Sequence, residues 1–133
     1  MYTFPLIPFR YSKTLTIGIL ILVLCLIPSS EISKIKMPVT FTDIIVHFAM
    51  FLAFSFALFL DLTRKRAGYQ PMKFIIIAIA LSFGLSCLTE LLQYLLVPLN
   101  RTGSLSDLAA DFGGSVVGTL MAAFIKRKFS AVS

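Results

Sequence analysis

Residues 90–118 of the chain read ELLQYLLVPLNRTGSLSDLAADFGGSVVG, starting at Glu90 and ending at Gly118. The stretch contains two apolar runs, each interrupted by a few acidic or amide side chains, with a short polar segment between them. Pro98 disfavours helical geometry at the residue before it and breaks the helical repeat. Residues 100–103 have the composition of a turn. The stretch therefore predicts two helices joined by a short connection, each with a few polar groups inside apolar sequence.

The composition of the whole chain is that of a membrane protein. Of its 133 residues, 58% are hydrophobic and only 14% are charged, and the mean hydropathy is +0.94. Soluble domains contain about 25% charged and 45–50% apolar residues. The formal net charge of +6 does not indicate nucleic-acid binding, because the cations lie in short segments beside apolar spans. We therefore expect an all-α, polytopic membrane protein, with residues 1–133 in a single domain and membrane lipids as its surroundings.

Four apolar stretches are long enough to be transmembrane helices, at about residues 11–28, 42–62, 73–97 and 104–125. A helix needs roughly 20 residues to cross a hydrocarbon core of about 30 Å, and backbone polar groups in that core must be bonded within the segment. The first stretch also has features of a signal peptide, because Arg10 and Lys13 precede a short apolar run. Pro28 occupies the position where a cleavage site needs a small residue, so we expect a retained helix and a bundle of four transmembrane helices.

Lys and Arg residues are distributed unevenly between the two sides of such a bundle. Nine of the twelve flank the N-terminus, the second connection or the C-terminus, and three lie in the first and third connections. Lys and Arg are enriched in cytoplasmic loops. The pattern predicts that both termini of a multi-pass membrane protein are cytoplasmic.

In this orientation, the polar side chains of the second, third and fourth helices lie near the outer side of the membrane at similar depths. Within each helix they are three or four positions apart, so they share one face. A charged side chain that faced lipid would cost about 2.5–3.5 kcal/mol, and convergence on one hydrated space avoids most of that cost. We therefore expect a polar pocket open to the outer face, with Arg101 as its lid or counter-charge. The expected ligand-binding residues are Asp43, His47, Glu90, Gln93, Arg101, Ser104, Asp107 and Asp111.

The order and spacing of these residues resemble those of the VanZ-like membrane proteins, over about residues 15–125. The segments that carry the resemblance are Asp43-Ile-Ile-Val-His47-Phe-Ala-Met-Phe51, Glu90-Leu-Leu-Gln93 and Arg101-Thr-Gly-Ser104-Leu-Ser-Asp107-Leu-Ala-Ala-Asp111-Phe-Gly-Gly114-Ser-Val-Val-Gly118. Two positions depart from the family pattern, since Ile44 replaces a lysine and Asp111 replaces an asparagine. The resemblance implies a multi-pass envelope protein of the bacterial plasma membrane, of a type linked to reduced susceptibility to teicoplanin-type lipoglycopeptide antibiotics. It does not imply a particular reaction.

Two of these residues, Glu90 and His47, are candidates for catalysis. Glu90 lies in the middle of its helix, where no capping role explains a carboxyl group. His47 is either an acid/base group or a hydrogen-bond partner that positions Glu90 or Asp107. Asp107 also has a structural explanation, because Ser104 followed three residues later by an acidic residue is similar to a capping box. The alternative for Glu90 and Asp107 is an acid/base pair in which the pKa of one carboxyl group is raised.

A metal site among these residues is chemically reasonable, because imidazole and carboxylate ligands suit zinc and manganese. The four candidate ligands are His47, Glu90, Asp107 and Asp111. However, no HExxH motif or other metal-ligand spacing is present, so neither a metal nor another cofactor is expected. A Ser-His-Asp triad that uses Ser104 or Ser106 is disfavoured, because neither serine lies in an elbow-like turn.

Three functions stay open at this point. The first is a binding or accessory protein whose pocket holds the head group of an amphiphile, either a lipid-linked envelope precursor or a lipidated antibiotic. The second is an enzyme in which Glu90 and His47 perform acid/base or metal-assisted chemistry on a lipid-linked substrate at the outer leaflet. The third is a small transporter formed by a homo-oligomer, because Gly114 and Gly118 are spaced for close helix contact. The same glycines are more simply explained by helix packing within the chain.

Overall fold

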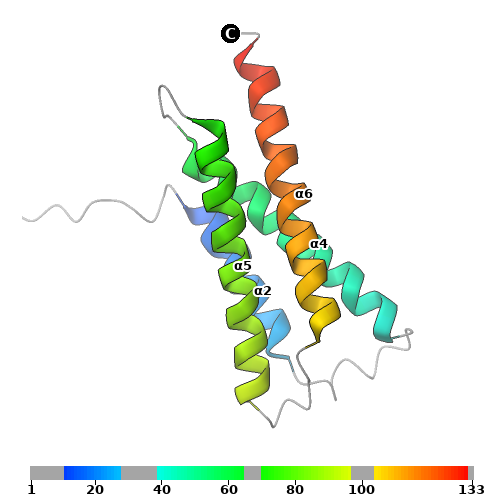
Figure 1. Cartoon of the computed structure of the whole chain (residues 1–133). Coiled ribbons are helices and arrows are strands. Elements are labelled where there is room, and N and C mark those ends of the chain that lie inside the picture. The colour runs from blue at the N-terminus through cyan, green and yellow to red at the C-terminus, as the bar shows by residue number, and fades with distance from the viewer. Residues whose placement is uncertain (1–10, 28–38, 65–69, 97–103, 132–133) are drawn as a thin grey trace, which may run out of the picture.

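The computed structural model describes residues 11–27, 39–64, 70–96 and 104–131, and these residues form four helices (Figure 1). The described segments contain only helices and their flanking turns, which confirms the prediction of an all-α fold. The helices are α2 (Ser12–Cys25), α4 (Val39–Leu62), α5 (Pro71–Leu95) and α6 (Leu105–Ser130).

Three of the helices, α4, α5 and α6, are long and apolar enough to cross a membrane. The first helix, α2, has only 14 residues, which corresponds to about 21 Å at 1.5 Å per residue. It is therefore shorter than a hydrocarbon core of about 30 Å. The structure thus gives three candidate transmembrane helices, and the expected count of four is not confirmed.

The last helix is longer than expected. Sequence analysis ended it near residue 125, at the start of the basic run, whereas α6 continues through Lys126, Arg127 and Lys128 to Ser130. Lys and Arg are good helix formers, and cations are favourable in the last turn of a helix, where the macrodipole is negative. A basic run after an apolar span therefore marks where the membrane ends and not where the helix ends.

The closest contact in the bundle is between α4 and α6, and two glycines of α6 make it possible. A Cβ atom at Gly114 would overlap the backbone oxygen of Phe48, and one at Gly118 would overlap the backbone oxygen of Leu52. Both glycines are buried. Helix packing within the chain is thereby confirmed as their role. The suggested homo-oligomer through Gly114 and Gly118 stays a prediction, although α4 of the same chain lies against both glycines.

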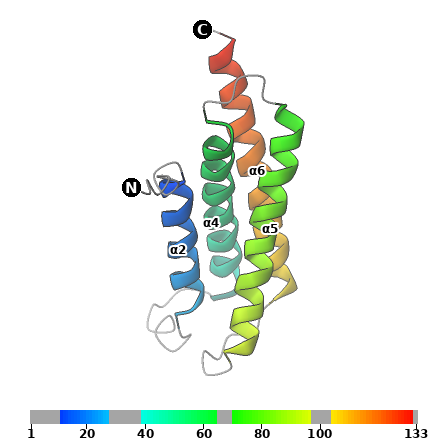
Figure 2. The same ribbon diagram turned by 90° about the vertical axis from the view of Figure 1, so that its left-hand side faces the viewer.

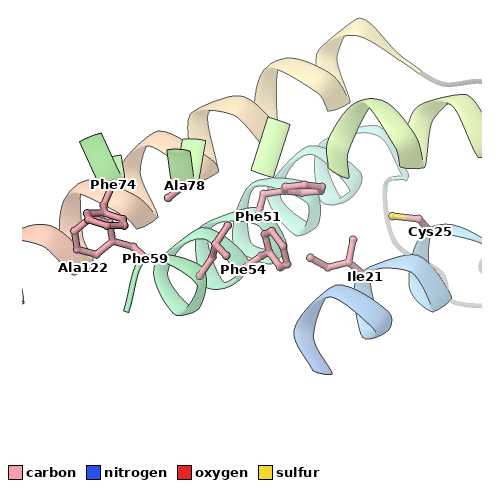
Figure 3. Close-up of a cluster of buried hydrophobic side chains, with 9 residues drawn as sticks. Ile21, Cys25, Phe51, Phe54, Phe59, Phe74, Ala78 and Ala122 are labelled. Atoms are coloured by element: carbon pink, nitrogen blue, oxygen red, sulfur yellow. The ribbon is translucent and has the colours of Figure 1, made fainter. Parts of the chain in front are cut away.

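An aromatic core connects the four helices (Figure 3). Phe51 and Phe54 meet edge to face with ring centroids 6.4 Å apart. Large apolar side chains on the outside of the bundle are exposed, among them Ile19, Ile76 and Phe124, as expected for a surface in contact with lipid. The core consists of Ile21, Cys25, Phe51, Phe54, Leu58, Phe59, Phe74, Ala78 and Ala122.

The described charges are separated along the bundle. The start of α2, the end of α4, the start of α5 and the end of α6 lie at the same end (Figure 2). All six Lys and Arg residues of the described segments lie at or near that end: Lys13, Arg64, Lys73, Lys126, Arg127 and Lys128. Four of the five described carboxyl groups belong to the opposite half: Asp43, Glu90, Asp107 and Asp111. The bundle therefore has a basic end and an acidic half.

Asp61 is the carboxyl group at the basic end, and it attaches α2 to α4. Its side chain is 5% exposed. Its Oδ2 accepts hydrogen bonds from the Thr14 hydroxyl at 2.7 Å and from the Thr14 backbone N–H at 3.4 Å. Thr14 lies in the first turn of α2, where backbone N–H groups have no partner within the helix. The role of Asp61 was not predicted from the sequence, although an acidic residue next to the end of an apolar span indicates a buried polar contact.

Replacing Asp61 with alanine is expected to loosen α2 from the bundle. The change leaves the Thr14 N–H and hydroxyl without their acceptor, and an unsatisfied buried polar group costs about 1–3 kcal/mol. Hydrogen exchange of the purified protein in detergent should show faster exchange in residues 12–25. Asp43→Ala is the matched control, because no hydrogen bond of Asp43 is present within the described residues. Equal exchange of α2 in both variants would contradict the proposed attachment.

Candidate functional site

Three helices contribute side chains to one hydrogen-bonded group in the acidic half of the bundle. His47 of α4 places its Nδ1 atom 3.0 Å from Oδ1 of Asp111 on α6. Ser86 of α5 donates its hydroxyl to the other oxygen, Oδ2, at 2.6 Å. The exposed fractions of His47, Ser86 and Asp111 are 4%, 0% and 0%. Both oxygens of the Asp111 carboxyl group are therefore held inside the bundle by neighbouring helices.

The start of α6 is fixed by a side-chain cap. Ser104 is the N-cap residue, and its hydroxyl accepts from the backbone N–H groups of Ser106 and Asp107, at 3.1 and 3.4 Å. Asp107 lies in the first turn, where the positive end of the helix dipole favours a carboxylate. The predicted cap is confirmed. Asp111 follows Asp107 by four residues, so both carboxyl groups lie on the same side of the helix.

The close approach of α4 and α6 determines the distance between His47 and Asp111. Gly114 lies against the backbone of Phe48, which is the residue after His47. Gly114 is also three residues after Asp111, on the same side of α6. A larger residue at this position would move α4 away from α6. The glycine contact and the short His47–Asp111 distance are therefore parts of the same arrangement.

Glu90 joins this group from α5, one turn after Ser86. One potential ligand atom each of His47, Glu90 and Asp111 lies within 4.8 Å of the others. Oε1 of Glu90 is buried and has no hydrogen-bond partner among the described residues. Asp107 is close enough to interact electrostatically with both His47 and Glu90. We call His47, Glu90, Asp107 and Asp111 the polar cluster.

Gln93 is attached to a different part of the bundle. It is 4% exposed, and its Nε2 donates to the backbone oxygen of Cys25 at 2.9 Å. Cys25 ends α2, and the last carbonyl groups of a helix have no partner within it. Gln93 therefore caps the end of α2 from α5, and its hydrogen bond does not involve the polar cluster.

The remaining expected site residues have different outcomes. Asp43 is half-buried one turn before His47. The hydroxyls of Ser104 and Ser106 bond to each other at the start of α6, and neither is hydrogen-bonded to His47 within the described residues. No Ser-His-Asp triad of the kind considered above is formed there. Arg101 lies outside the described residues.

Ser86 is the site residue that sequence analysis missed. Thr89 and Ser115, which are also buried, donate to backbone oxygens of their own helices, whereas Ser86 donates to a carboxylate on another helix. Its position four residues before Glu90, on the same helical face, is the signal that could have identified it.

A cavity is found at the basic end of the bundle, between α2 and α4. It has a volume of about 480 Å³, and Lys13, Ile17, Phe56 and Leu60 are among its lining residues. It lies away from the polar cluster, because Asp61 also lines it. This cavity is not the outward-facing pocket that was expected around the polar cluster, and that pocket stays a prediction.

The polar cluster is capable of two kinds of chemistry. If His47 donates its Nδ1 proton to Asp111, the lone pair of Nε2 is available as a base, and the carboxylate orients the ring. If Nδ1 is not protonated, the imidazole and carboxylate atoms together form a donor set for a cation. Both alternatives use the same three helices.

Comparison with known proteins identifies one family. A family model described as VanZ/LLP1 matches residues 2–126, which is nearly the whole chain. No curated protein and no solved structure matches the chain.

Proposed function

We propose a binding function for this protein, which belongs to the VanZ/LLP1 family and has three helices that could cross a membrane. In this proposal the polar cluster binds the head group of an amphiphilic ligand in the cell envelope, and the apolar part of the ligand lies against the outside of the bundle. The ligand is either a lipid-linked envelope precursor or a lipoglycopeptide antibiotic of the teicoplanin type. Binding of either would lower antibiotic susceptibility.

The observation that carries this proposal is the convergence of the polar cluster. Oε1 of Glu90 is buried without a hydrogen-bond partner in the described part of the chain. An unpaired polar group in an apolar environment costs about 2–7 kcal/mol. The Glu90 carboxyl group also interacts with the backbone of Ser104 at the start of α6, but this does not provide a partner for Oε1. A group retained at such an energetic cost is expected to meet a ligand.

The distribution of charge supports an orientation for the site. The basic end of the bundle carries all six described Lys and Arg residues, and cationic loops favour the cytoplasmic side. We therefore propose a multi-pass protein of the bacterial plasma membrane with both termini cytoplasmic and the polar cluster toward the outer face. In this arrangement α2 crosses as the fourth span, together with the apolar residues that follow it and with some local thinning of the bilayer.

A second candidate function is catalysis, and the His47–Asp111 hydrogen bond favours it. A carboxylate that holds Nδ1 leaves Nε2 as a general base, and Glu90 is close enough to act as the partner acid. The substrate would be a lipid-linked molecule at the outer leaflet. The transporter hypothesis has less support, because the glycine contact proposed for its oligomer is occupied within the chain.

Glu90→Gln separates binding from catalysis, because it keeps the shape of the side chain and removes the group that transfers a proton. For a binding protein, the affinity for the amphiphile should fall by about 10–100-fold, since a hydrogen bond to a charged group contributes about 1.5–3 kcal/mol. For an enzyme, conversion of the ligand should fall by about 10²–10⁴-fold. Native mass spectrometry of the purified protein measures the retained ligand and any product.

The matched control is Cys87→Ser, because Cys87 is an exposed residue of α5 three positions before Glu90. This variant should retain the ligand as the unmodified protein does. The antibiotic susceptibility of cells that express each variant should follow the retained amount. Glu90→Leu removes the hydrogen-bonding atoms that Glu90→Gln keeps. If Glu90→Leu retains as much amphiphile as Cys87→Ser, the polar cluster is not the binding site.

A further inference from the structure

We infer that His47, Glu90 and Asp111 form a binding site for one divalent transition-metal ion, and that this ion accepts the anionic head group of the ligand. The inference deepens the proposed binding function and rests on it for the role of the ion. Zinc and manganese are the metals that the donor set favours, because imidazole and carboxylate ligands together suit them.

The geometry of the three residues fits a metal site. Their potential ligand atoms lie within 4.8 Å of one another, and His47 Nδ1 is 3.0 Å from Asp111 Oδ1. Two ligands of a tetrahedral zinc ion, each about 2.0–2.2 Å from the metal, are separated by about 3.4 Å. The His47–Asp111 distance is close to this separation, and the Glu90 oxygen lies within 4.8 Å of both atoms.

Ser86 holds the Asp111 carboxylate in the orientation that such a site requires. Its hydroxyl donates to Oδ2 at 2.6 Å, which leaves Oδ1 directed toward His47. Carboxylates that bind metals are themselves held by hydrogen bonds, and loss of such a partner lowers metal affinity by about 10–100-fold. This explains why a buried hydroxyl of α5 bonds to a side chain of another helix.

The charge of the polar cluster also favours a cation. Glu90 and Asp111 bring two carboxyl groups together beside His47, and uncompensated charge inside a membrane is costly. The Lys and Arg residues of the described segments are all at the basic end of the bundle. A divalent ion would neutralise two carboxylates. It would also provide a partner for Glu90 Oε1, which is buried without a hydrogen-bond partner in the described part of the chain.

A metal ion also resolves a conflict in the proposed function. A phosphate or carboxylate head group would be repelled by the carboxylates of the polar cluster alone. Three protein ligands leave an open coordination position on zinc, which an anionic oxygen of the ligand is able to occupy. Sequence analysis expected no metal, because the donors come from three helices and form no local motif.

The test is metal binding to the purified full-length protein in detergent, first stripped with a chelator and then exposed to ZnCl₂ or MnCl₂. Elemental analysis after desalting should find about one ion per chain. His47→Ala and Glu90→Gln should each weaken binding at least tenfold in calorimetric titrations. Cys87→Ser should bind as the unmodified protein does, which excludes the exposed thiol as the ligand. Full binding by His47→Ala, or no bound metal in the unmodified protein, would overturn the inference.

A further variant keeps the test valid if His47→Ala fails to fold. In His47→Cys a thiolate replaces the imidazole, and thiolates are also zinc ligands. The cobalt-loaded His47→Cys protein should show a thiolate-to-cobalt charge-transfer band that the cobalt-loaded unmodified protein lacks. Absence of this band in a folded variant that binds cobalt would place the metal elsewhere and reject the site.

Failure of this inference is distinguishable from failure of the proposed function. If native mass spectrometry finds an amphiphile that stays bound after the chelator has removed all metal, the inference is wrong and the binding function stands. If the metal binds with the expected variants but no amphiphile is retained, the metal site stands and its role toward a ligand is wrong.

Discussion

Gly118→Ala is expected to destabilise the protein by about 1–3 kcal/mol, the usual effect of overpacking a tight contact. The added Cβ would overlap the backbone oxygen of Leu52 and the hydroxyl oxygen of Ser55. A backbone oxygen moves only if its helix moves, so α4 must shift away from α6. Alanine is a better helix former than glycine by about 1 kcal/mol, and the steric effect must therefore exceed an opposing one. Denaturant unfolding in detergent micelles measures the difference.

Gly84→Ala is the control with the opposite expected sign. Among the described residues, no atom beyond the neighbouring backbone of α5 lies within 4 Å of a Cβ placed at Gly84, and this glycine is exposed. The variant should therefore gain up to about 1 kcal/mol from helix propensity alone. If Gly118→Ala and Gly84→Ala have the same stability, α4 and α6 are not in close contact as described.

Gly114→Ala tests whether the spacing of α4 and α6 also affects the polar cluster. Its Cβ would overlap the backbone of Phe48, next to His47. Separation of the helices at this level increases the distance from His47 to Asp111, so metal binding should weaken more in Gly114→Ala than in Gly118→Ala. The two glycines are four residues apart, or about 6 Å along the helix, and the difference between them measures how strongly the site depends on local spacing.

The polar cluster was largely predictable because two features of the sequence agreed, namely the depth of the polar residues in the membrane and their helical spacing. Depth from the membrane surface placed His47, Glu90 and Asp111 at one level, and spacings of three or four residues placed each pair of polar side chains on one face. Gly114 and Gly118 indicated that another helix approaches this face of α6 closely, but they did not indicate that the helix is α4. The convergence therefore follows from features that are visible in a single sequence.

The role of Gln93 shows where such reasoning ends. Residues three positions apart on a helix differ by about 60° in direction, so Glu90 and Gln93 were assigned to one face. In the structure Gln93 reaches the end of α2, at the Cys25 carbonyl. The packing of the whole bundle determines which helices lie beside α5, and the sequence of α5 alone does not indicate them.

The bounds of α2 illustrate a second limit. Hydropathy describes how long an apolar run is, and the run here continues to Ile27. The helix itself ends at Cys25, where Gln93 caps it. The anchor at the other end, between Thr14 and Asp61, also comes from a distant residue. Contacts that depend on distant side chains were missed at both ends of this helix.

Asp111→Leu and Asp111→Asn are expected to differ sharply, because they remove different properties of the side chain. Leucine leaves His47 and the Ser86 hydroxyl without their partner, and each unsatisfied buried polar group costs about 1–3 kcal/mol. Asparagine keeps an oxygen for Ser86 and an amide N–H for the unprotonated Nδ1 of His47, so the loss of stability should stay below about 1.5 kcal/mol. Unfolding in detergent gives both values.

Asp111→Asn also tests what the acid contributes beyond stability, since the VanZ-like pattern has asparagine where this chain has aspartate. Removal of the charge takes one anionic ligand from the proposed ion, so metal affinity should fall at least tenfold while the fold persists. Unchanged metal binding in Asp111→Asn would show that His47 and Glu90 bind the ion without Asp111. A stability loss as large as that of leucine would show instead that the carboxylate charge, and not its hydrogen-bonding geometry, holds α4, α5 and α6 together at this level.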